Sequence, residues 1–224
     1  STSPRQHRWI SREELVYIEE DHPAALLNGS QINASPSPPK LAVPWKQILK
    51  NRPFRCTVIA HACYNYGYYV VLSWVSDYFK TEYHADYAKL GLVSMLPYCL
   101  LLFTNPAAGF WADWMERNGT KTVKMRKIIN SFGMFGAAIG FWLSGYIAEF
   151  NTPGDKQKYL YLAAIVLAVT VSVGGFMVGG IWSNFRDLSK VHAPVLVGIS
   201  NSVASIPGIV GQGVTGNILK WTNG

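Results

Sequence analysis

Charged residues are scarce in this sequence, at only 15% of its 224 positions. Soluble domains commonly carry about a quarter, and 49% of this chain is hydrophobic, so the composition argues against both a disordered chain and an ordinary soluble enzyme. Cysteine is scarce too. Cys56, Cys63 and Cys99 form no CxxC pair and no Cys/His group at metal spacing, so we expect neither a disulfide framework, a metal site nor a cofactor.

Long apolar stretches make up most of the chain after residue 52. A bilayer core of about 30 Å requires roughly 20 mostly apolar residues in a helix. The stretches that meet this requirement are Phe54–Phe79, Leu90–Ala112, Ile128–Phe150, Tyr159–Ser183 and Pro194–Leu219. The sequence therefore predicts an all-α integral membrane protein with five transmembrane helices in the lipid bilayer. A polar leader (residues 1–52) precedes this helical bundle (residues 53–224).

Basic residues are distributed unevenly around these stretches and predict their orientation. On alternate sides of the five spans, Lys and Arg number fifteen on the leader side and five on the other. Cytoplasmic loops of membrane proteins carry an excess of Lys and Arg, so we expect the leader to be cytoplasmic. This topology accounts for the net charge of +7, and we expect no nucleic-acid partner. The pattern does not indicate which membrane holds the chain.

The leader contains two short amphipathic segments. Ser11 and Glu14 have the spacing of a capping box, which predicts a helix over residues 13–20. Pro44–Lys50 predicts a second helix with Pro44 in its first position, and its Trp and Lys residues are typical of a membrane interface. Between them, Pro23–Pro39 has the composition of a linker.

Polar residues within the apolar stretches are costly in a bilayer, so their placement is informative. Three polar residues recur on one helix face of the first span, and a stripe of polar and small residues runs along one face of the fifth span. Pro207 and Gly208 are expected to interrupt the fifth helix near its middle, as in helices that line cavities. Together with the second span, these features predict a polar cavity. Its candidate lining residues are His61, Asn65, Tyr68, Tyr98, Asn201, Ser205 and Gln212.

Alternative interpretations stay open for these residues. Asn, Ser and Gln can hydrogen-bond between helices, and Tyr can lie at the membrane interface. His61 is either a neutral side chain bonded to a neighbouring helix or a contact for a proton or an anion. The pairs Gly136/Gly140 and Gly175/Gly179 have the spacing of close helix contacts.

Short motifs in a consistent order carry a family resemblance. His61–Tyr69, Leu96–Tyr98 and Gly198–Gly211 resemble signatures of helices seven, eight and eleven in the anion:cation symporter family of the major facilitator superfamily. Gly109–Asp113, Val123–Ile128 and Asn184–Asp187 resemble further motifs of this family, and Trp9–Ile18 resembles its central cytoplasmic loop.

The resemblance implies a fold and a function. The chain would hold the central loop and helices seven to eleven of a C-terminal half, with the six N-terminal helices and helix twelve missing. The parent would be a symporter that moves an organic or inorganic anion, of phosphate or carboxylate type, with H⁺ or Na⁺ by alternating access. Because no carboxylate lies in mid-membrane here, the coupling acids would belong to the N-terminal half. The resemblance places a charge network at Asp113, Arg126, Lys127 and Asp187.

The sequence also departs from the family pattern at some positions, and two rival functions remain. Leu188–His192 differs from the family motif, and Tyr64 stands where glutamate-transporting members carry Arg, which favours a sialin-like or phosphate-like branch. A membrane enzyme using His61 as a base would need a second convergent group that mid-membrane positions do not offer, so we do not expect an enzyme. The other alternative is a truncated, non-transporting half-transporter with a scaffold or regulatory role.

Overall fold

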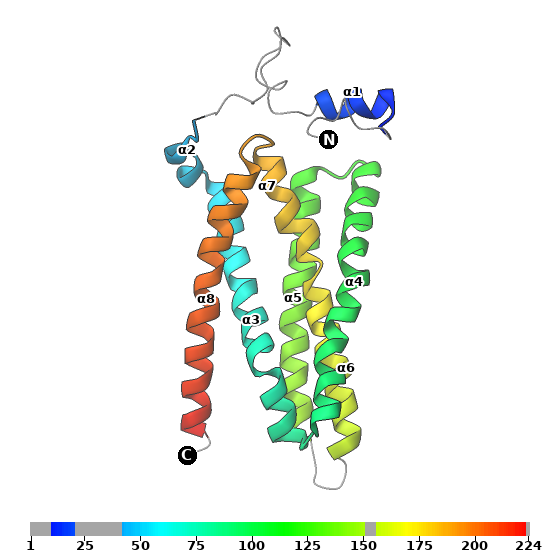
Figure 1. Cartoon of the computed structure of the whole chain (residues 1–224), viewed down its shortest axis with the longest axis vertical. Coiled ribbons are helices and arrows are strands. Elements are labelled where there is room, and N and C mark those ends of the chain that lie inside the picture. Colours follow the sequence, from blue (N-terminus) through cyan, green and yellow to red (C-terminus); the bar gives the residue numbers. More distant parts are fainter. Residues whose placement is uncertain (1–9, 21–41, 151–155, 223–224) are drawn as a thin grey trace.

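Long helices lying side by side make up most of the protein (Figure 1). The structure, a computed structural model, describes residues 10–20, 42–150 and 156–222, so the linker expected at 23–39 lies outside the described residues. Two short helices come first, α1 (Arg12–Glu20) and α2 (Trp45–Lys50). The helices that follow are α3 (Arg52–Tyr83), α4 (Tyr87–Arg117), α5 (Thr122–Glu149), α6 (Lys156–Gly174), the π-helical turn η2 (Val178–Trp182), α7 (Ser183–Leu188) and α8 (Ala193–Thr222).

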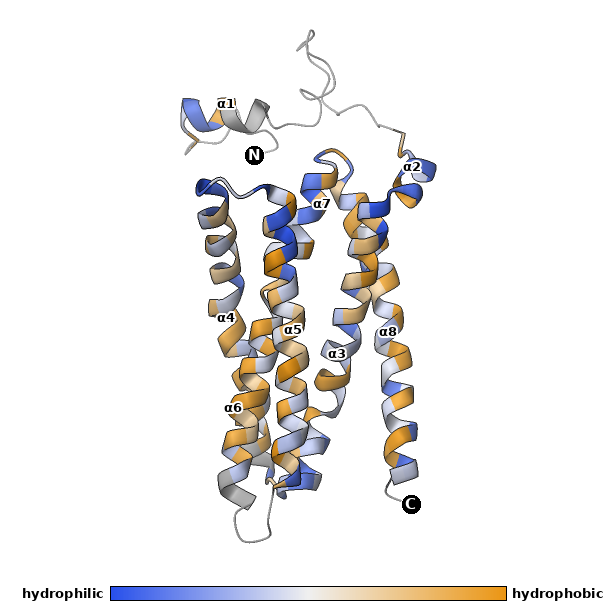
Figure 2. Cartoon of the chain, turned by 180° about the vertical axis from the view of Figure 1, so that it is seen from behind, coloured by the Kyte–Doolittle hydropathy of each residue, from blue (hydrophilic) through white to orange (hydrophobic). Residues whose placement is uncertain are grey.

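The all-helical membrane architecture is confirmed, with four helices long and apolar enough to cross a bilayer. These are Leu90–Arg117, Thr122–Glu149, Tyr159–Leu188 and Ala193–Thr222. With 32 residues, α3 is longer than any of them, but its many polar and tyrosine side chains lower its hydropathy. The crossing of α3, and hence the count of five spans, stays a prediction. Figure 2 shows hydrophobic residues along the helices and hydrophilic residues gathered at the ends beside α2 and α7.

Successive long helices run in opposite directions, so their connections lie alternately at two ends of the bundle (Figure 1). The 117–122 and 188–193 connections lie at the end that carries α2, whereas the 83–87 connection and the end of α8 lie at the other. The fifteen-to-five count of Lys and Arg on the two sides of the bundle assumes this alternation of the connections. Which end faces the cytoplasm stays a prediction.

Glycines bring α6 close to its neighbours, as the spacing of these residues predicts. A methyl group added at Gly136 of α5 would lie 2.5 Å from the Val173 side chain of α6, and one at Gly140 would overlap Thr170. After α6 ends, Gly179 lies against the backbone of α4, where an added methyl would be 3.1 Å from the carbonyl oxygen of Ala108. The interpretation of these glycines as close helix contacts is confirmed.

The span expected at Tyr159–Ser183 is not one regular helix. Its α-helical part ends at Gly174, and the π-helical turn begins at Val178. In between, the backbone N–H groups of Gly175 and Phe176 donate to carbonyls three residues earlier, rather than four. Such departures inside a helix mark a local change of pitch.

The interruption expected at Pro207 and Gly208 is wrong, because α8 continues through both residues. Proline removes one backbone donor from a helix, and membrane helices tolerate it when neighbouring groups compensate. The two prolines inside α4, Pro97 and Pro106, are accommodated in the same way.

The two short helices begin close to their predicted positions. The backbone N–H of Glu14 donates to Ser11 Oγ at 3.1 Å, which is one half of the expected capping box. Pro44 is the N-cap of α2 rather than its first helical residue. Asn51 then joins α2 to α3, because its side chain accepts from the N–H of Phe54 at 3.0 Å.

Candidate functional site

The polar residues of α3 meet α8 along one interface, which we call the α3–α8 seam (His61, Asn65, Ser200 and Ala204). His61 Nδ1 and Ser200 Oγ share a hydrogen bond of 2.9 Å, and Asn65 Nδ2 donates to the carbonyl oxygen of Ala204 at 3.1 Å. The His61 side chain is only 2% exposed and contacts the ring of Trp182 edge-on. Both hydrogen bonds therefore connect helices, which favours the interhelical alternative for these two residues.

The seam continues along the helices through tyrosine rings packed on glycines. A methyl group added at Gly208 would lie 2.6 Å from the ring of Tyr69, and one at Gly211 would lie 3.1 Å from the ring of Tyr66. Gly208 thus provides space for an aromatic ring of α3 instead of interrupting α8.

The predicted polar residues of α8 lie on a different face from the seam. Asn201, Ser205 and Gln212 are all exposed, and Ser205 Oγ donates to the backbone carbonyl of Asn201 at 2.8 Å. The structure therefore separates them from His61 and Asn65, although the sequence predicts one cavity lined by all five residues.

Sequence reasoning missed Ser200, the partner of His61. Ser200, Ala204 and Gly208 recur every four residues, and this pattern of small residues is typical of close helix contacts in membranes. The spacing was therefore a usable signal. A second missed contact joins Asn184 and Thr57, where Asn184 Nδ2 donates to Thr57 Oγ1 at 2.7 Å.

Tyrosines connect α3 to α4 on another side of α3. Tyr68 stacks on Tyr64 with ring centroids 6.2 Å apart, and the side chains of Tyr68 and Tyr98 interact across the two helices. Asn105 of α4 lies beside Gly175, and its side-chain oxygen is buried without a hydrogen-bond partner in the described part of the chain.

Two pockets border α3, and neither includes a residue of α8. One, of about 240 Å³, lies between α3, α5 and α6 and is lined by Tyr64, Tyr68 and Thr170 among others. The other, of about 560 Å³, is open and lies between the end of α3 and the start of α4. Neither pocket is the cavity expected between the first, second and fifth spans, which stays a prediction.

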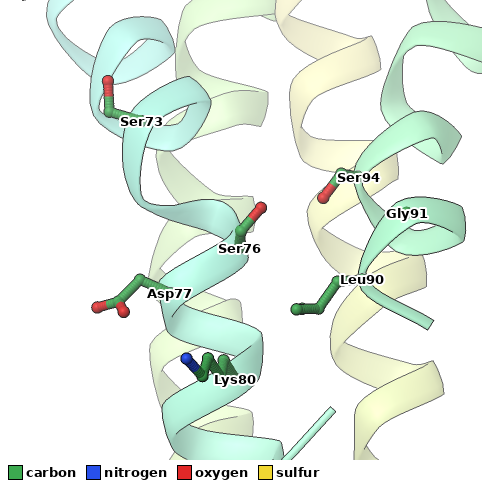
Figure 3. Close-up of a pocket in the computed structure, with 7 residues that line it drawn as sticks. All are labelled: Ser73, Ser76, Asp77, Lys80, Leu90, Gly91 and Ser94. Atoms are coloured by element: carbon green, nitrogen blue, oxygen red, sulfur yellow. The ribbon is translucent and has the colours of Figure 1, made fainter. Parts of the chain in front are cut away.

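The open pocket contains several polar side chains (Figure 3). Ser76 of α3 and Ser94 of α4 point toward each other across the gap, whereas Asp77 points away from α4. The hydroxyl of Ser94 is buried and has no hydrogen-bond partner among the described residues.

An ion pair connects two of the four residues of the expected charge network. Arg126 Nε of α5 donates to Asp187 Oδ2 of α7 at 2.7 Å, and its Nη1 donates to the carbonyl oxygen of Gly179 in η2 at 2.8 Å. Asp113 and Lys127 are exposed and lie outside this pair. Arg126 thus holds both η2 and α7 against α5.

Metal binding has no candidate among the described residues, which bring together no group of three or more His, Cys, Asp and Glu side chains. The polar side chains of the α3–α8 seam and of the exposed face of α8 are amides, hydroxyls and one imidazole, which suit hydrogen bonding to a polar or anionic molecule.

Known proteins resemble the chain over most of its length. The profile of the Major Facilitator Superfamily matches residues 8–212. Human sialin (Homo sapiens) is 32% identical over 216 residues, 94% of this chain and 39% of sialin. The chloroplastic ascorbate transporter of Arabidopsis thaliana is 29% identical over 91% of this chain and 35% of its own length. The chloroplastic sodium-dependent phosphate transport protein 1 of the same plant is 26% identical, over 95% and 40% respectively.

These comparisons define the family and the limits of the likeness. The chain spans about two fifths or less of the length of these curated relatives. The family and the relatives are transporters, which contradicts the alternative of a membrane enzyme with His61 as its base. The chain belongs to the Major Facilitator Superfamily, and its relatives match the anion:cation symporter family.

Proposed function

We propose that this chain is the C-terminal part of a secondary active transporter for a small anion of phosphate or carboxylate type. It works by alternating access together with an N-terminal six-helix half, and transport is coupled to H⁺ or Na⁺. The names of its relatives, which include an ascorbate transporter, a sodium-dependent phosphate transport protein and anion transporters, support this proposal. The coupling acids belong to the N-terminal half in this proposal.

The polar outer face of α8 is the observation that carries the proposal. Asn201, Ser205 and Gln212 are exposed on a helix that is apolar enough to cross a membrane. Amide side chains facing lipid hydrocarbon are costly, so such residues usually face a protein partner or a water-filled cavity. We therefore place this face on the translocation path, opposite the N-terminal half, where its amides donate to the oxygens of the anion.

The α3–α8 seam supports that face in a positioning role. His61 and Asn65 fix the rotation of α8 about its axis through their bonds to Ser200 and Ala204. This rotation sets the direction in which Asn201 points, because Asn201 directly follows Ser200 in the helix.

The charge network has a proposed role at the leader end of the bundle. Arg126 and Asp187 are already paired within this chain. Asp113 and Lys127 are exposed near the same end, and we propose that they pair with the N-terminal half when the transporter closes on this side.

We propose that the leader lies in the cytoplasm, which the fifteen-to-five distribution of basic residues supports. Lys121→Cys should react with an impermeant thiol reagent from the cytoplasmic side, and Lys80→Cys from the opposite side. Equal labelling of both from one side would overturn this orientation.

Substitutions of Asn201 and Asn65 in the full-length transporter test the proposal. An amide that donates to the anion contributes about 1–3 kcal/mol, so Asn201→Ala should raise the apparent KM roughly 5- to 150-fold without lowering the melting temperature. Asn65→Ala should lower the melting temperature, because it removes the hydrogen bond that joins α3 to the Ala204 carbonyl of α8, and should change KM less.

The matched control is Asn217→Ala, since Asn217 is an exposed asparagine 16 residues further along α8. Asn217→Ala should change neither the apparent KM nor the melting temperature. An unchanged KM in Asn201→Ala, with a lowered melting temperature, would remove Asn201 from the translocation path. Sustained uptake by this chain alone in proteoliposomes would exclude the non-transporting half-transporter.

A further inference from the structure

The helix α2 and the first turn of α3 present basic and apolar side chains together at one end of the bundle. Trp45 and Leu49 are 54% and 56% exposed, although both are large and hydrophobic. Four basic side chains accompany them, and all four are exposed. We call this surface the interfacial patch; its members are Trp45, Lys46, Leu49, Lys50, Arg52 and Arg55.

The bundle holds α2 in a fixed orientation. Ile48 is buried in a hydrophobic cluster with Phe54 and Phe185. Asn51 links the two helices, because its backbone N–H donates to the carbonyl of Ile48 at 3.1 Å and its side chain accepts from the N–H of Phe54. One face of α2 is therefore packed inward, and the side chains of the interfacial patch are left on the outside.

The position of α2 matches the boundary of a bilayer. Figure 1 shows α2 at the edge of the bundle, beside the first turns of α3 and not over the centre of the helices. Along α3, Arg55 is exposed, and Ile59, one turn later, is 62% exposed. This change from basic to apolar exposure, within about 6 Å of helix rise, marks the level at which lipid headgroups give way to hydrocarbon.

Within the described part of the chain, no acidic side chain compensates the charge of the interfacial patch. The sequence has no Asp or Glu from residue 22 to residue 76. None of the four basic residues forms an ion pair with another described residue, in contrast to Arg126, which is paired with Asp187. Long basic side chains beside exposed Trp and Leu suit a surface where apolar atoms enter the membrane and charges reach anionic headgroups.

We propose that the interfacial patch binds the headgroups of anionic phospholipids in the leaflet on the leader side. Trp45 and Leu49 enter the boundary between headgroups and hydrocarbon, and the four cations contact lipid phosphates. Each Lys or Arg near an anionic membrane surface strengthens binding about fivefold, and the attraction weakens as salt increases.

Binding of phosphatidylglycerol to the purified chain, measured by titration in neutral-lipid nanodiscs, tests the proposal. Lys46→Gln/Lys50→Gln should weaken this binding roughly 30-fold. The matched control is Lys121→Gln/Lys124→Gln, which removes the same charge from two exposed lysines at the same end of the bundle. The control should retain most of the binding. Equal losses in both variants, or no loss in either, would overturn the proposal.

A second measurement distinguishes lipid from a protein segment as the occupant. A fluorophore attached at Trp45→Cys, in a chain with Ser in place of its three cysteines, should be quenched strongly by a lipid carrying a spin label at headgroup depth. A label at the end of the acyl chain should quench it less. Absence of quenching by either lipid would mean that α2 is covered by protein or lies in water, and the proposal would be wrong.

Discussion

The segment α6–η2–α7 and the helix α8 are similar in length but are buried to very different extents. In its most apolar window, the first has 61% of its residues buried inside the bundle, and α8 has 28%. The first contacts α3, α4 and α5 through glycines, whereas α8 contacts mainly α3, through the hydrogen bonds and tyrosine rings of the seam. The α6 helix is therefore the structural centre of the bundle, whereas α8 leaves polar side chains exposed on the face that we propose for a partner or a substrate.

The largest effect is expected where α5 and α6 approach most closely. Gly140→Ala would place a methyl group against Thr170, which is held in place because its hydroxyl donates to the carbonyl of Val166 at 2.7 Å. Overpacking of this kind costs about 1–3 kcal/mol, so the melting temperature in detergent should fall clearly. Gly145→Ala is the control on the same helix, because an added methyl there meets nothing within 4 Å. Equal melting temperatures for the two variants would contradict the close contact.

A somewhat smaller effect is expected at the ion pair beside η2. Arg126→Ala removes the donors to the Gly179 carbonyl and to the Asp187 carboxylate. Leaving such groups unpaired costs about 1–3 kcal/mol, with the lower part of that range applying here because Asp187 is partly exposed. Lys127→Ala, which removes an exposed neighbouring charge, should leave thermal stability unchanged. If Lys127→Ala is as destabilising as Arg126→Ala, the loss reflects charge alone rather than the contacts to η2.

The smallest effect is expected at the seam, where one hydrogen bond joins His61 and Ser200. A double-mutant cycle with His61→Leu and Ser200→Ala should give a coupling energy of about 0.5–1.5 kcal/mol, measured from thermal unfolding. The same cycle with Ser202→Ala in place of Ser200→Ala should give none, because Ser202 is exposed and bonds only within α8. Zero coupling between His61 and Ser200 would show that the seam depends on shape rather than on this hydrogen bond.

The parts of the fold that follow from local patterns were predictable from the sequence. The length of an apolar stretch indicates a membrane helix, and glycines four residues apart indicate close packing. Both signals can be read from a short stretch of sequence, because neither signal depends on residues far away in the chain. The faces of α8 were harder to assign. Polar residues indicate that a helix face does not contact lipid, but they do not distinguish a buried helix contact from an exposed face. Both the seam and the exposed face of α8 contain polar residues, and the consecutive residues Ser200 and Asn201 belong to different faces.

The change of pitch after Gly174 could not be predicted in the same way. The doublets Gly174–Gly175 and Gly179–Gly180 permit it, because glycine imposes few limits on the backbone. What stabilises it is the guanidinium of Arg126, which reaches the Gly179 carbonyl from 53 residues earlier in the chain. A contact so distant in sequence leaves no local signature.

The π-helical turn makes the number of residues in this segment as important as their identity. A π-helical turn holds an additional residue compared with an α-helical turn, and each residue of an α-helix turns the chain by about 100°. The wide turn takes up its additional residue locally, so deleting one residue within Val178–Trp182 should restore regular pitch and leave α7 in phase. Deleting Asn184, after the turn, should instead rotate the rest of α7 by that angle. Phe185 would then leave the core and Asp187 would turn away from Arg126, even though both side chains are unchanged. The segment should therefore tolerate a shortening within the π-helical turn but not within α7.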